Sequence, residues 1–228
     1  MEVDNYYIKE GYSENLNEGG GVVKQYTSPP MDKIWQIEVY KYATRIIKEK
    51  ESKKVIEFGS GSGYKLMKYI SPITKDITGI DFEHSIKFCK DTYGIGNWIS
   101  LDFDKPDQQL SGPYDLIMAI DVIEHLVKPE KMLQQMKACA GKNSLLLIST
   151  PERDLVRGHD TFGPPDNKKH VREWNQEEFN KFISSQGLEI IDHRLVKAKK
   201  FTPREWFYHV RKGKSMNTCQ LALCKLSQ

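Results

Sequence analysis

Apolar and polar positions along this chain follow two periods that alternate several times between residues 31 and 226. Short apolar runs with the length of buried strands occur at residues 53–58, 76–81, 97–103, 114–121, 144–150, 188–196 and 218–226. Apolar residues three or four apart predict helices at 31–50, 64–70, 84–93, from 122 to about 140, and at 176–187. This order predicts an α/β fold, a doubly wound, mostly parallel seven-stranded sheet with helices on both faces.

The segments outside this alternation are long or polar. Residues 151–175 and 197–217 form long connections, which in compact domains are commonly functional. No helix is evident between the last two strands, so one of them is expected to run antiparallel. Residues 1–30 are polar and contain Gly19-Gly20-Gly21 and Pro29-Pro30. We therefore expect residues 1–50 to form an arm and a helical lid, and residues 51–228 to form the ligand-binding part of the same domain.

Composition bounds the size, location and partners of the protein. A chain of 228 residues suffices for one sizeable domain, and no apolar run approaches the roughly 20 residues of a membrane span. The N-terminus lacks the basic start and apolar core of a secretory signal, and the four cysteines form no CxxC pair, so we expect a cytoplasmic protein with reduced thiols. The net charge of +3 does not by itself indicate a nucleic-acid partner.

The run VIEFGSGSG at residues 55–63 places glycine at every second position directly after the first predicted strand. Small residues at a strand end let backbone N–H groups approach a polar ligand, although glycine also serves ordinary turns. The spacing differs from G-x-G-x-x-G, which suits a pyrophosphate, and an acid, Glu57, precedes the first glycine. A carboxylate at this point favours a cationic ligand that carries an ammonium and a sulfonium group.

Acidic residues end the next three predicted strands on the same edge of the sheet. Asp81 ends the second strand, where a carboxylate can accept hydrogen bonds from both hydroxyls of a ribose. The third strand ends in Asp102-Phe103, an acid suited to an exocyclic amine and a ring suited to a purine, and the fourth ends in Ile120-Asp121. Together these strand ends fit an amino acid, a ribose and an adenine, which are the parts of S-adenosylmethionine.

With these motifs the chain resembles the class I methyltransferases that use S-adenosylmethionine and share a Rossmann-like fold. VIEFGSGSG, ITGIDF and LDFD are similar to the first three motifs of that family, and YDLIMAIDVIEHLVKP resembles the form found in ubiquinone-biosynthesis-type and many bacterial small-molecule methyltransferases. The resemblance covers about residues 53–195 and implies S-adenosylmethionine as the cofactor. It implies cofactor contacts at Glu57, Gly59, Ser60, Gly61, Gly63, Asp81, Phe82, Asp102, Phe103, Ile120 and Asp121.

Methyl transfer to a hydroxyl benefits from a general base, for which histidine is the usual candidate. His170, in KKHVREW after the fifth predicted strand, is the preferred catalytic residue, followed by His125 and then His159. A different role is open for the His-x-x-Glu-Trp run, which can anchor its loop to the core through Trp174.

The sequence argues against several acceptors. No Asn/Asp-Pro-Pro-aromatic run follows the fourth strand, as amino methylation of DNA bases requires, and no proline precedes a cysteine, as cytosine carbon methylation requires. Asp121 and Glu124 lack a supporting Asp-Asn pair, so we expect no metal. Residues 197–214, KAKKFTPREWFYHVRKGK, are basic with interleaved aromatics, and suit an anionic small substrate, RNA, or a solvated hairpin.

These observations predict an O-methyltransferase that acts on a small sugar-like or phosphorylated acceptor, as in polysaccharide, lipid or natural-product pathways. Three alternatives remain open at this point: an RNA methyltransferase, a nicotinamide-dependent oxidoreductase on a similar sheet, and a module that binds the cofactor without catalysis. The oligomeric state is not indicated by the sequence.

Overall fold

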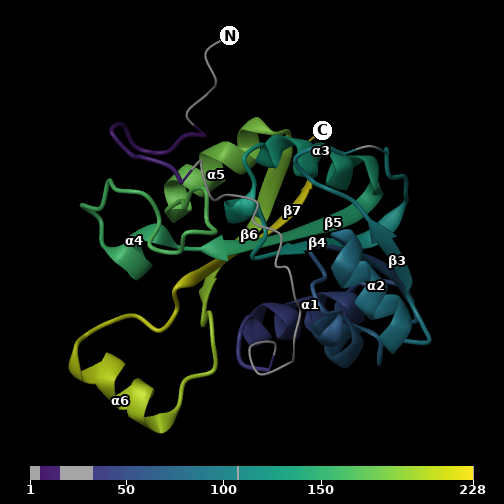
Figure 1. The fold of residues 1–228 in the computed structure, drawn as a ribbon, viewed down its shortest axis with the longest axis horizontal. Helices are drawn as coiled ribbons and strands as arrows, with labels where there is room; N and C mark the ends of the chain where they lie inside the picture. The colour runs from purple at the N-terminus through teal and green to yellow at the C-terminus, as the bar shows by residue number, and fades with distance from the viewer. Residues whose placement is uncertain (1–5, 16–32, 107, 228) are drawn as a thin grey trace.

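The computed structural model describes residues 6–15, 33–106 and 108–227. Its centre is one seven-stranded sheet in the order β3-β2-β1-β4-β5-β7-β6 (Figure 1). The predicted doubly wound α/β fold is confirmed, and each predicted strand overlaps an observed one. The strands are β1 (Lys54–Phe58), β2 (Asp76–Asp81), β3 (Asn97–Ser100), β4 (Tyr114–Ile120), β5 (Ala140–Pro151), β6 (Leu188–Val196) and β7 (Cys219–Leu226).

Strand direction divides the sheet into two parts. β1 pairs in parallel with β2 and β4, β2 with β3, and β4 with β5. β7 runs antiparallel to both of its neighbours, β5 and β6. The prediction that one of the last two strands is antiparallel is therefore confirmed.

Helices cover both faces of the sheet over two hydrophobic clusters (Figure 1). α3 and α5 pack on one face, and α1, the π-helical turn and α2 on the other. Strands buried on both sides read as continuous apolar runs, as in β4, where residues 116–120 are all buried. The helices are α1 (Ile37–Glu49), the π-helical turn (Leu66–Ile70), α2 (Glu83–Thr92), a 3₁₀ turn (Ile123–His125), α3 (Pro129–Ala138), α4 (Arg153–Arg157), α5 (Gln176–Ser185) and α6 (Pro203–Arg211).

The first helix begins later than its pattern predicts. Residues 1–5 and 16–32, which include most of the expected arm and Met31, lie outside the described residues, and α1 begins at Ile37. Gln36 adopts a left-handed backbone conformation with φ of 63°, and its N–H donates to the carbonyl oxygen of Ala198 at 2.7 Å. The backbone before α1 is thus tied to the segment after β6, a long-range contact that local periodicity does not contain.

The two long connections differ from what the pattern predicts. We call residues 152–175 the inner connection and residues 197–218 the outer connection. The inner connection contains α4 and the outer one contains α6, so the expectation of no helix between β6 and β7 is wrong. α6 begins with Pro203 after a capping box formed by Thr202 and Glu205. None of its residues is buried, so α6 adds no residue to the two hydrophobic clusters.

Other boundaries shift by a few residues. β3 ends at Ser100 rather than at residue 103, and β5 begins at Ala140 rather than at residue 144. The helix predicted from 122 to about 140 is divided into the 3₁₀ turn and α3, because Pro129 starts a new helix. Among the described residues, no helix has the length and apolarity to cross a membrane.

Candidate active site

The strand order reverses between β1 and β4, which are neighbours in the sheet. In a doubly wound sheet, ligands bind at such a reversal, outside the carboxyl ends of the strands. The predicted cofactor residues lie in or just after the carboxyl ends of β1, β2, β3 and β4, and therefore on this edge. The fold thus brings segments 20 to 60 residues apart in sequence to one place.

The glycine loop after β1 needs glycine at two positions for packing reasons. Gly59 and Gly63 have φ of 77° and 70°, a region that side chains disfavour. A Cβ at Gly59 would lie 2.3 Å from a methyl carbon of Val122, and one at Gly63 would lie 2.8 Å from the ring of Trp98. These two glycines therefore set the shape of the loop.

Asp81 holds the glycine loop to the end of β2. Its Oδ2 accepts the N–H of Gly61 at 2.8 Å, and its Oδ1 accepts the N–H of Phe82 at 2.8 Å. Burial raises the pKa of Asp81, while the two backbone N–H groups act in the opposite direction. Each carboxylate oxygen retains a second lone pair. Asp81 can therefore position the loop and still accept ribose hydroxyls, as predicted for it.

Two polar groups are buried beside the loop. Glu57 is 1% exposed, and the hydroxyl of Tyr40, from α1, donates to its carboxylate. The Ser60 hydroxyl oxygen is buried without a hydrogen-bond partner among the described residues. A buried hydroxyl without a partner is destabilising unless a bound molecule satisfies it.

Asp121 follows β4 in a left-handed conformation with φ of 52°. Such backbone strain in a residue other than glycine is concentrated at functional sites. Its Oδ1 accepts from the Ser149 hydroxyl at 2.8 Å, and its Oδ2 accepts from the Gln36 side-chain amide at 2.8 Å. The preceding Ile120 is buried at 3% exposure. β4, β5 and the start of α1 thus fix this carboxylate together.

Of the residues predicted beside the adenine, Phe82, Asp102 and Phe103, the last two lie in different surroundings. The Oδ1 of Asp102 accepts the N–H of Asp104 at 2.9 Å and so stabilises its own turn. Phe103 is 5% exposed, and its ring centroid lies 5.6 Å from that of Phe58 in the core. Phe103 therefore offers little surface for stacking on a purine, and its cofactor contact stays a prediction.

The two leading histidine candidates lie together. The ring centroids of His125, in the 3₁₀ turn after β4, and His170, in the inner connection, are 4.7 Å apart with planes at 88°. Burial lowers the pKa of His125 to about 4, which keeps its ring neutral near neutral pH. Burial also raises the pKa of the neighbouring Glu124 well above its ordinary value. His159, by contrast, has a side chain that is 82% exposed.

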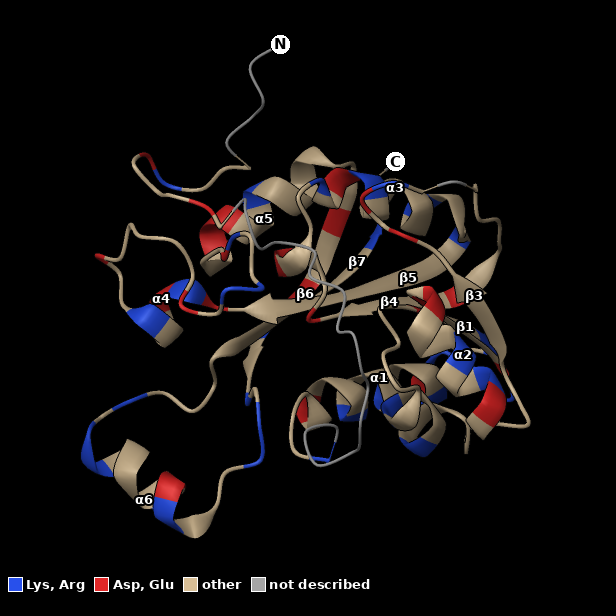
Figure 2. Ribbon diagram, in the orientation of Figure 1, with Lys and Arg blue, Asp and Glu red and all other residues tan. Residues whose placement is uncertain are grey.

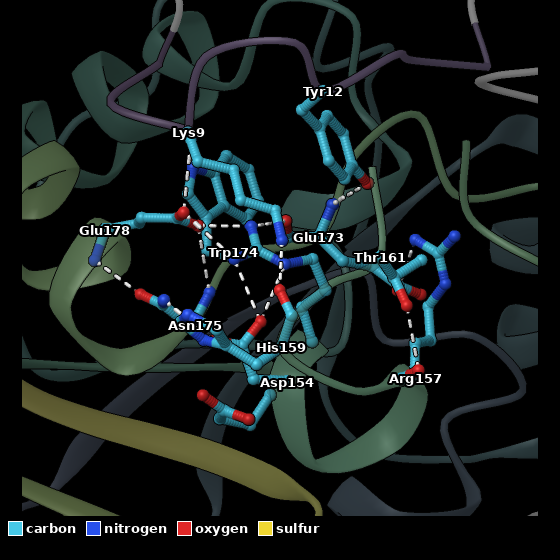
Figure 3. A network of polar contacts seen from close by, with 12 residues as sticks. Lys9, Tyr12, Asp154, Arg157, His159, Thr161, Glu173, Trp174, Asn175 and Glu178 are labelled. Carbon is cyan, nitrogen blue, oxygen red and sulfur yellow. Dashed lines mark hydrogen bonds and ion pairs between the residues drawn. The ribbon is translucent and has the colours of Figure 1, made fainter. Parts of the chain in front are cut away.

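An N-terminal strap, residues 6–15, crosses over the inner connection (Figure 3). The N–H of Asn15 donates to the carbonyl oxygen of Val171 at 3.0 Å, and the N–H of Glu173 donates to the Tyr12 hydroxyl at 3.1 Å. The indole N–H of Trp174, a fully buried side chain, donates to the carbonyl oxygen of Tyr6 in the strap. The His-x-x-Glu-Trp run therefore does anchor its loop, the role left open for it beside catalysis.

Buried charges hold the inner connection in place. The Arg153 guanidinium is fully buried, and both of its NH groups contact the Glu178 carboxylate, one at 2.9 Å. Arg172 is 1% exposed and pairs with Glu14 of the strap at 2.6 Å. Paired charges of this kind fix a conformation, because moving either partner leaves a charge buried alone.

Sequence reasoning missed several residues of the site. Gln36 and Tyr40 come from the helical region before the first motif, and they reach Asp121 and Glu57. A polar residue on the buried face of α1 is the one signal that could have revealed Tyr40. Ser149 was read only as part of an apolar strand, and no local pattern marks it.

The residues on this edge fit S-adenosylmethionine. Glu57 and Asp81 supply carboxylates for an ammonium group and a ribose, and the buried Ser60 hydroxyl is unsatisfied by the described protein. Asp121, with its left-handed backbone, follows β4 directly on the same edge. Acceptors predominate among these groups, as a cationic ligand requires.

Comparison with known proteins finds methyltransferases, in agreement with the motifs and the fold. Residues 35–193 match the sequence model of a methyltransferase domain family. The ubiquinone biosynthesis O-methyltransferase of Bradyrhizobium diazoefficiens is 24% identical over 152 residues, which are 63% of this chain and 58% of that protein. The chain therefore matches little more than half the length of that curated relative.

Solved structures share the fold. An S-adenosylmethionine-dependent methyltransferase from Clostridium acetobutylicum has a TM-score of 0.61 at 12% identity, with 83% of this chain and 91% of that chain covered. The methyltransferase domain of bacterial CtHen1-C has a TM-score of 0.58 at 20% identity, with 83% and 97% covered. The matched family spans more than half of the sequence and disfavours the nicotinamide alternative. The chain belongs to the methyltransferase domain family.

Proposed function

We propose that this protein transfers a methyl group from S-adenosylmethionine to an oxygen of a small anionic acceptor, such as a phosphorylated metabolite or a nucleotide sugar. The bound cofactor supplies a methyl group already activated on a sulfonium, so the protein must mainly align the acceptor. O-methylation agrees with the similarity to the ubiquinone biosynthesis O-methyltransferase of Bradyrhizobium diazoefficiens. The main support for an anionic acceptor is a basic pocket next to the sheet edge where the predicted cofactor residues lie.

The basic pocket has a volume of about 550 Å³ and is bounded by α1, the π-helical turn and the outer connection. Six lysines line it, against a single acid, Glu38. Such an excess of ammonium groups attracts phosphate and carboxylate groups. The lining residues are Lys33, Ile37, Glu38, Lys41, Lys68, Tyr69, Lys197, Lys199, Lys200, Phe201, Pro203 and Trp206. Figure 2 shows Lys and Arg along the outer connection on both sides of α6.

The pocket adjoins the cofactor edge through Gln36. This residue precedes the pocket residue Ile37, and its side-chain amide donates to Asp121 at 2.8 Å. The N–H of Lys200 donates to the carbonyl oxygen of Ile34 at 2.7 Å, which joins the two walls of the pocket. An acceptor held by these lysines would lie beside the predicted methionine end of the cofactor site.

The orientation of the His170 and His125 rings agrees with the general-base role predicted for them. The Nδ1 atoms of His170 and His125 face acceptor oxygens of Glu173 and Lys169, respectively. Each ring is therefore oriented with Nε2 available to accept a proton. A carboxylate that orients a histidine is a common arrangement for a base. His170 remains the preferred catalytic residue of this proposal.

The decisive test has two parts. Calorimetry with S-adenosylhomocysteine measures the cofactor site, and release of S-adenosylhomocysteine on incubation with phosphorylated metabolites, sugar nucleotides and quinone precursors identifies the acceptor class. Binding without turnover on any acceptor would favour a non-catalytic module. Turnover confined to neutral acceptors would overturn the anionic assignment.

Lysine variants test the pocket directly. The double variant Lys197→Gln/Lys200→Gln should raise KM for the acceptor about tenfold or more, because hydrogen bonds to charged groups contribute about 1.5–3 kcal/mol and 1.4 kcal/mol is a factor of ten. Affinity for S-adenosylhomocysteine should not change. Lys75→Gln/Lys142→Gln is the matched control, because both lysines lie by the amino ends of strands, at the opposite edge.

RNA is a second candidate acceptor, supported by the aromatic residues of α6. Trp206, Phe207 and Tyr208 are 49%, 61% and 52% exposed and lie among basic residues, an arrangement that can stack bases. RNA binding would weaken steeply with rising salt. Affinity for short RNA that does not depend on salt, or no affinity, would eliminate this candidate.

A further inference from the structure

Three side chains that could bind a metal ion lie together after the carboxyl end of β4. Glu124, His125 and His170 each offer one ligand atom, and these atoms all lie within 4.8 Å of one another. The first two belong to the 3₁₀ turn after β4, and His170 belongs to the inner connection. The segments are joined directly, because the N–H of Val171 donates to the carbonyl oxygen of Glu124 at 2.7 Å.

Both imidazole rings use the same nitrogen, Nδ1, for their hydrogen bonds to the described residues. The Nδ1 of His125 lies 2.9 Å from the carbonyl oxygen of Lys169, and the Nδ1 of His170 lies 2.6 Å from a carboxylate oxygen of Glu173. These oxygens can only accept, so each Nδ1 carries the hydrogen and each Nε2 carries a lone pair. Metal-binding histidines are held in this way, by a carboxylate or a carbonyl oxygen on the second ring nitrogen.

The carboxylate gives an independent sign of a missing ligand. Glu124 is 1% exposed. Its Oε2 accepts from the Thr150 hydroxyl at 3.0 Å, but its Oε1 is buried without a hydrogen-bond partner among the described residues. A buried carboxylate oxygen without a partner is costly, and a bound cation removes that cost.

We propose that Glu124, His125 and His170 bind a divalent transition-metal ion. Two imidazole nitrogens and one carboxylate oxygen form a ligand set suited to Zn²⁺ and to Fe²⁺ or Co²⁺, rather than to Mg²⁺, which prefers oxygen. Three protein ligands leave at least one position open, as in catalytic rather than structural sites. The sequence argued against a metal because no Asp-Asn pair is present; here histidines take that place.

The metal site would change how the acceptor is activated. Asp121, at the end of β4 on the cofactor side of the sheet, lies three residues before Glu124 in the sequence. A cation there would make an acceptor hydroxyl easier to deprotonate. It would also occupy the Nε2 lone pairs and so replace the general-base role predicted for the two histidines. This consequence rests on the proposed O-methyl transfer, whereas the metal site itself does not.

The test measures metal binding without cofactor or acceptor. The full chain is stripped with a chelator and titrated with Zn²⁺ by calorimetry, and with Co²⁺ by visible absorption. One ion per chain and Co²⁺ bands typical of nitrogen and oxygen ligands are expected. His170→Gln and Glu124→Gln should each weaken Zn²⁺ binding more than the roughly 10–100-fold loss that follows removal of a group bonded to a ligand.

His159→Gln is the matched control, because this histidine lies in the same connection as His170 but is exposed. The Zn²⁺ affinity of this variant should equal that of the unchanged chain. Near- and far-ultraviolet circular dichroism in chelator establishes that each variant is folded. If a ligand variant fails to fold, Glu173→Gln should still weaken binding about tenfold. Metal binding equal in His170→Gln and the unchanged chain, or no binding by the unchanged chain, would overturn the proposal. Metal binding without turnover on any oxygen acceptor would instead refute only the proposed function.

Discussion

The inner and outer connections have similar lengths and each leads into or contains a helix with a capping box, yet they are stabilised in opposite ways. The inner connection buries charged groups, such as Arg153 and Arg172, under the N-terminal strap. The outer connection carries α6 away from the sheet (Figure 1). No residue of α6 is buried, and its aromatic rings are exposed. The difference indicates that the inner connection is part of the folded core, whereas the outer one is free to adapt to a ligand.

The largest expected effect comes from the buried ion pair of the inner connection. Arg153→Met should lower the free energy of unfolding by about 3–5 kcal/mol, because the Glu178 carboxylate would stay buried without its partner. Urea denaturation monitored by circular dichroism measures this change. A loss below about 1 kcal/mol, the size expected for an exposed pair, would mean that the inner connection is no more fixed than the outer one.

The two capping boxes allow a matched comparison of smaller size. Asn175→Ala, at the end of the inner connection, removes an acceptor for the N–H of Glu178 and should cost about 1–2 kcal/mol of global stability. Thr202→Ala removes the same kind of acceptor at α6. It should change global stability by less than about 0.5 kcal/mol, but should speed amide hydrogen exchange within α6. Equal global losses would show that α6 unfolds together with the sheet.

The smallest stability effect is expected at the exposed rings of α6. Trp206→Ser should change the free energy of unfolding by no more than about 0.5 kcal/mol, yet raise KM for the acceptor, because Trp206 lines the basic pocket. Phe207→Ser is the control, since this ring is 61% exposed and is absent from the pocket lining. An equal change in KM for both variants would argue for a general effect on α6 rather than a contact with the acceptor.

The features of the fold that the sequence predicted are those with local signals. β2 and β6 have the predicted bounds, because apolar alternation and flanking breakers are local signals. The switch point followed from the order of elements, so the edge that carries Glu57, Asp81 and Asp121 was predictable before their contacts were known.

The remaining features depend on contacts between distant segments. The late start of α1 follows from the bond between Gln36 and Ala198, and the pairing of Glu124 with His125 and His170 follows from how the inner connection folds back. α6 could have been found from Thr202-Pro203-x-Glu205, a capping-box signal that does not need a buried face. Phe103 was predicted to end the third strand, but β3 ends at Ser100, and the packing of Phe103 against Phe58 could not be read from the sequence.

The position of β7 has a consequence for how the chain is made. β7 is the last strand in the sequence, yet it lies between β5 and β6, and it is the partner of β6 in the described sheet. During synthesis, β6 therefore emerges with no neighbour and must wait for residues 219–226 before it can pair. A ribosome that stalls within the outer connection would release a chain with an open sheet edge, a species prone to association with other nascent chains.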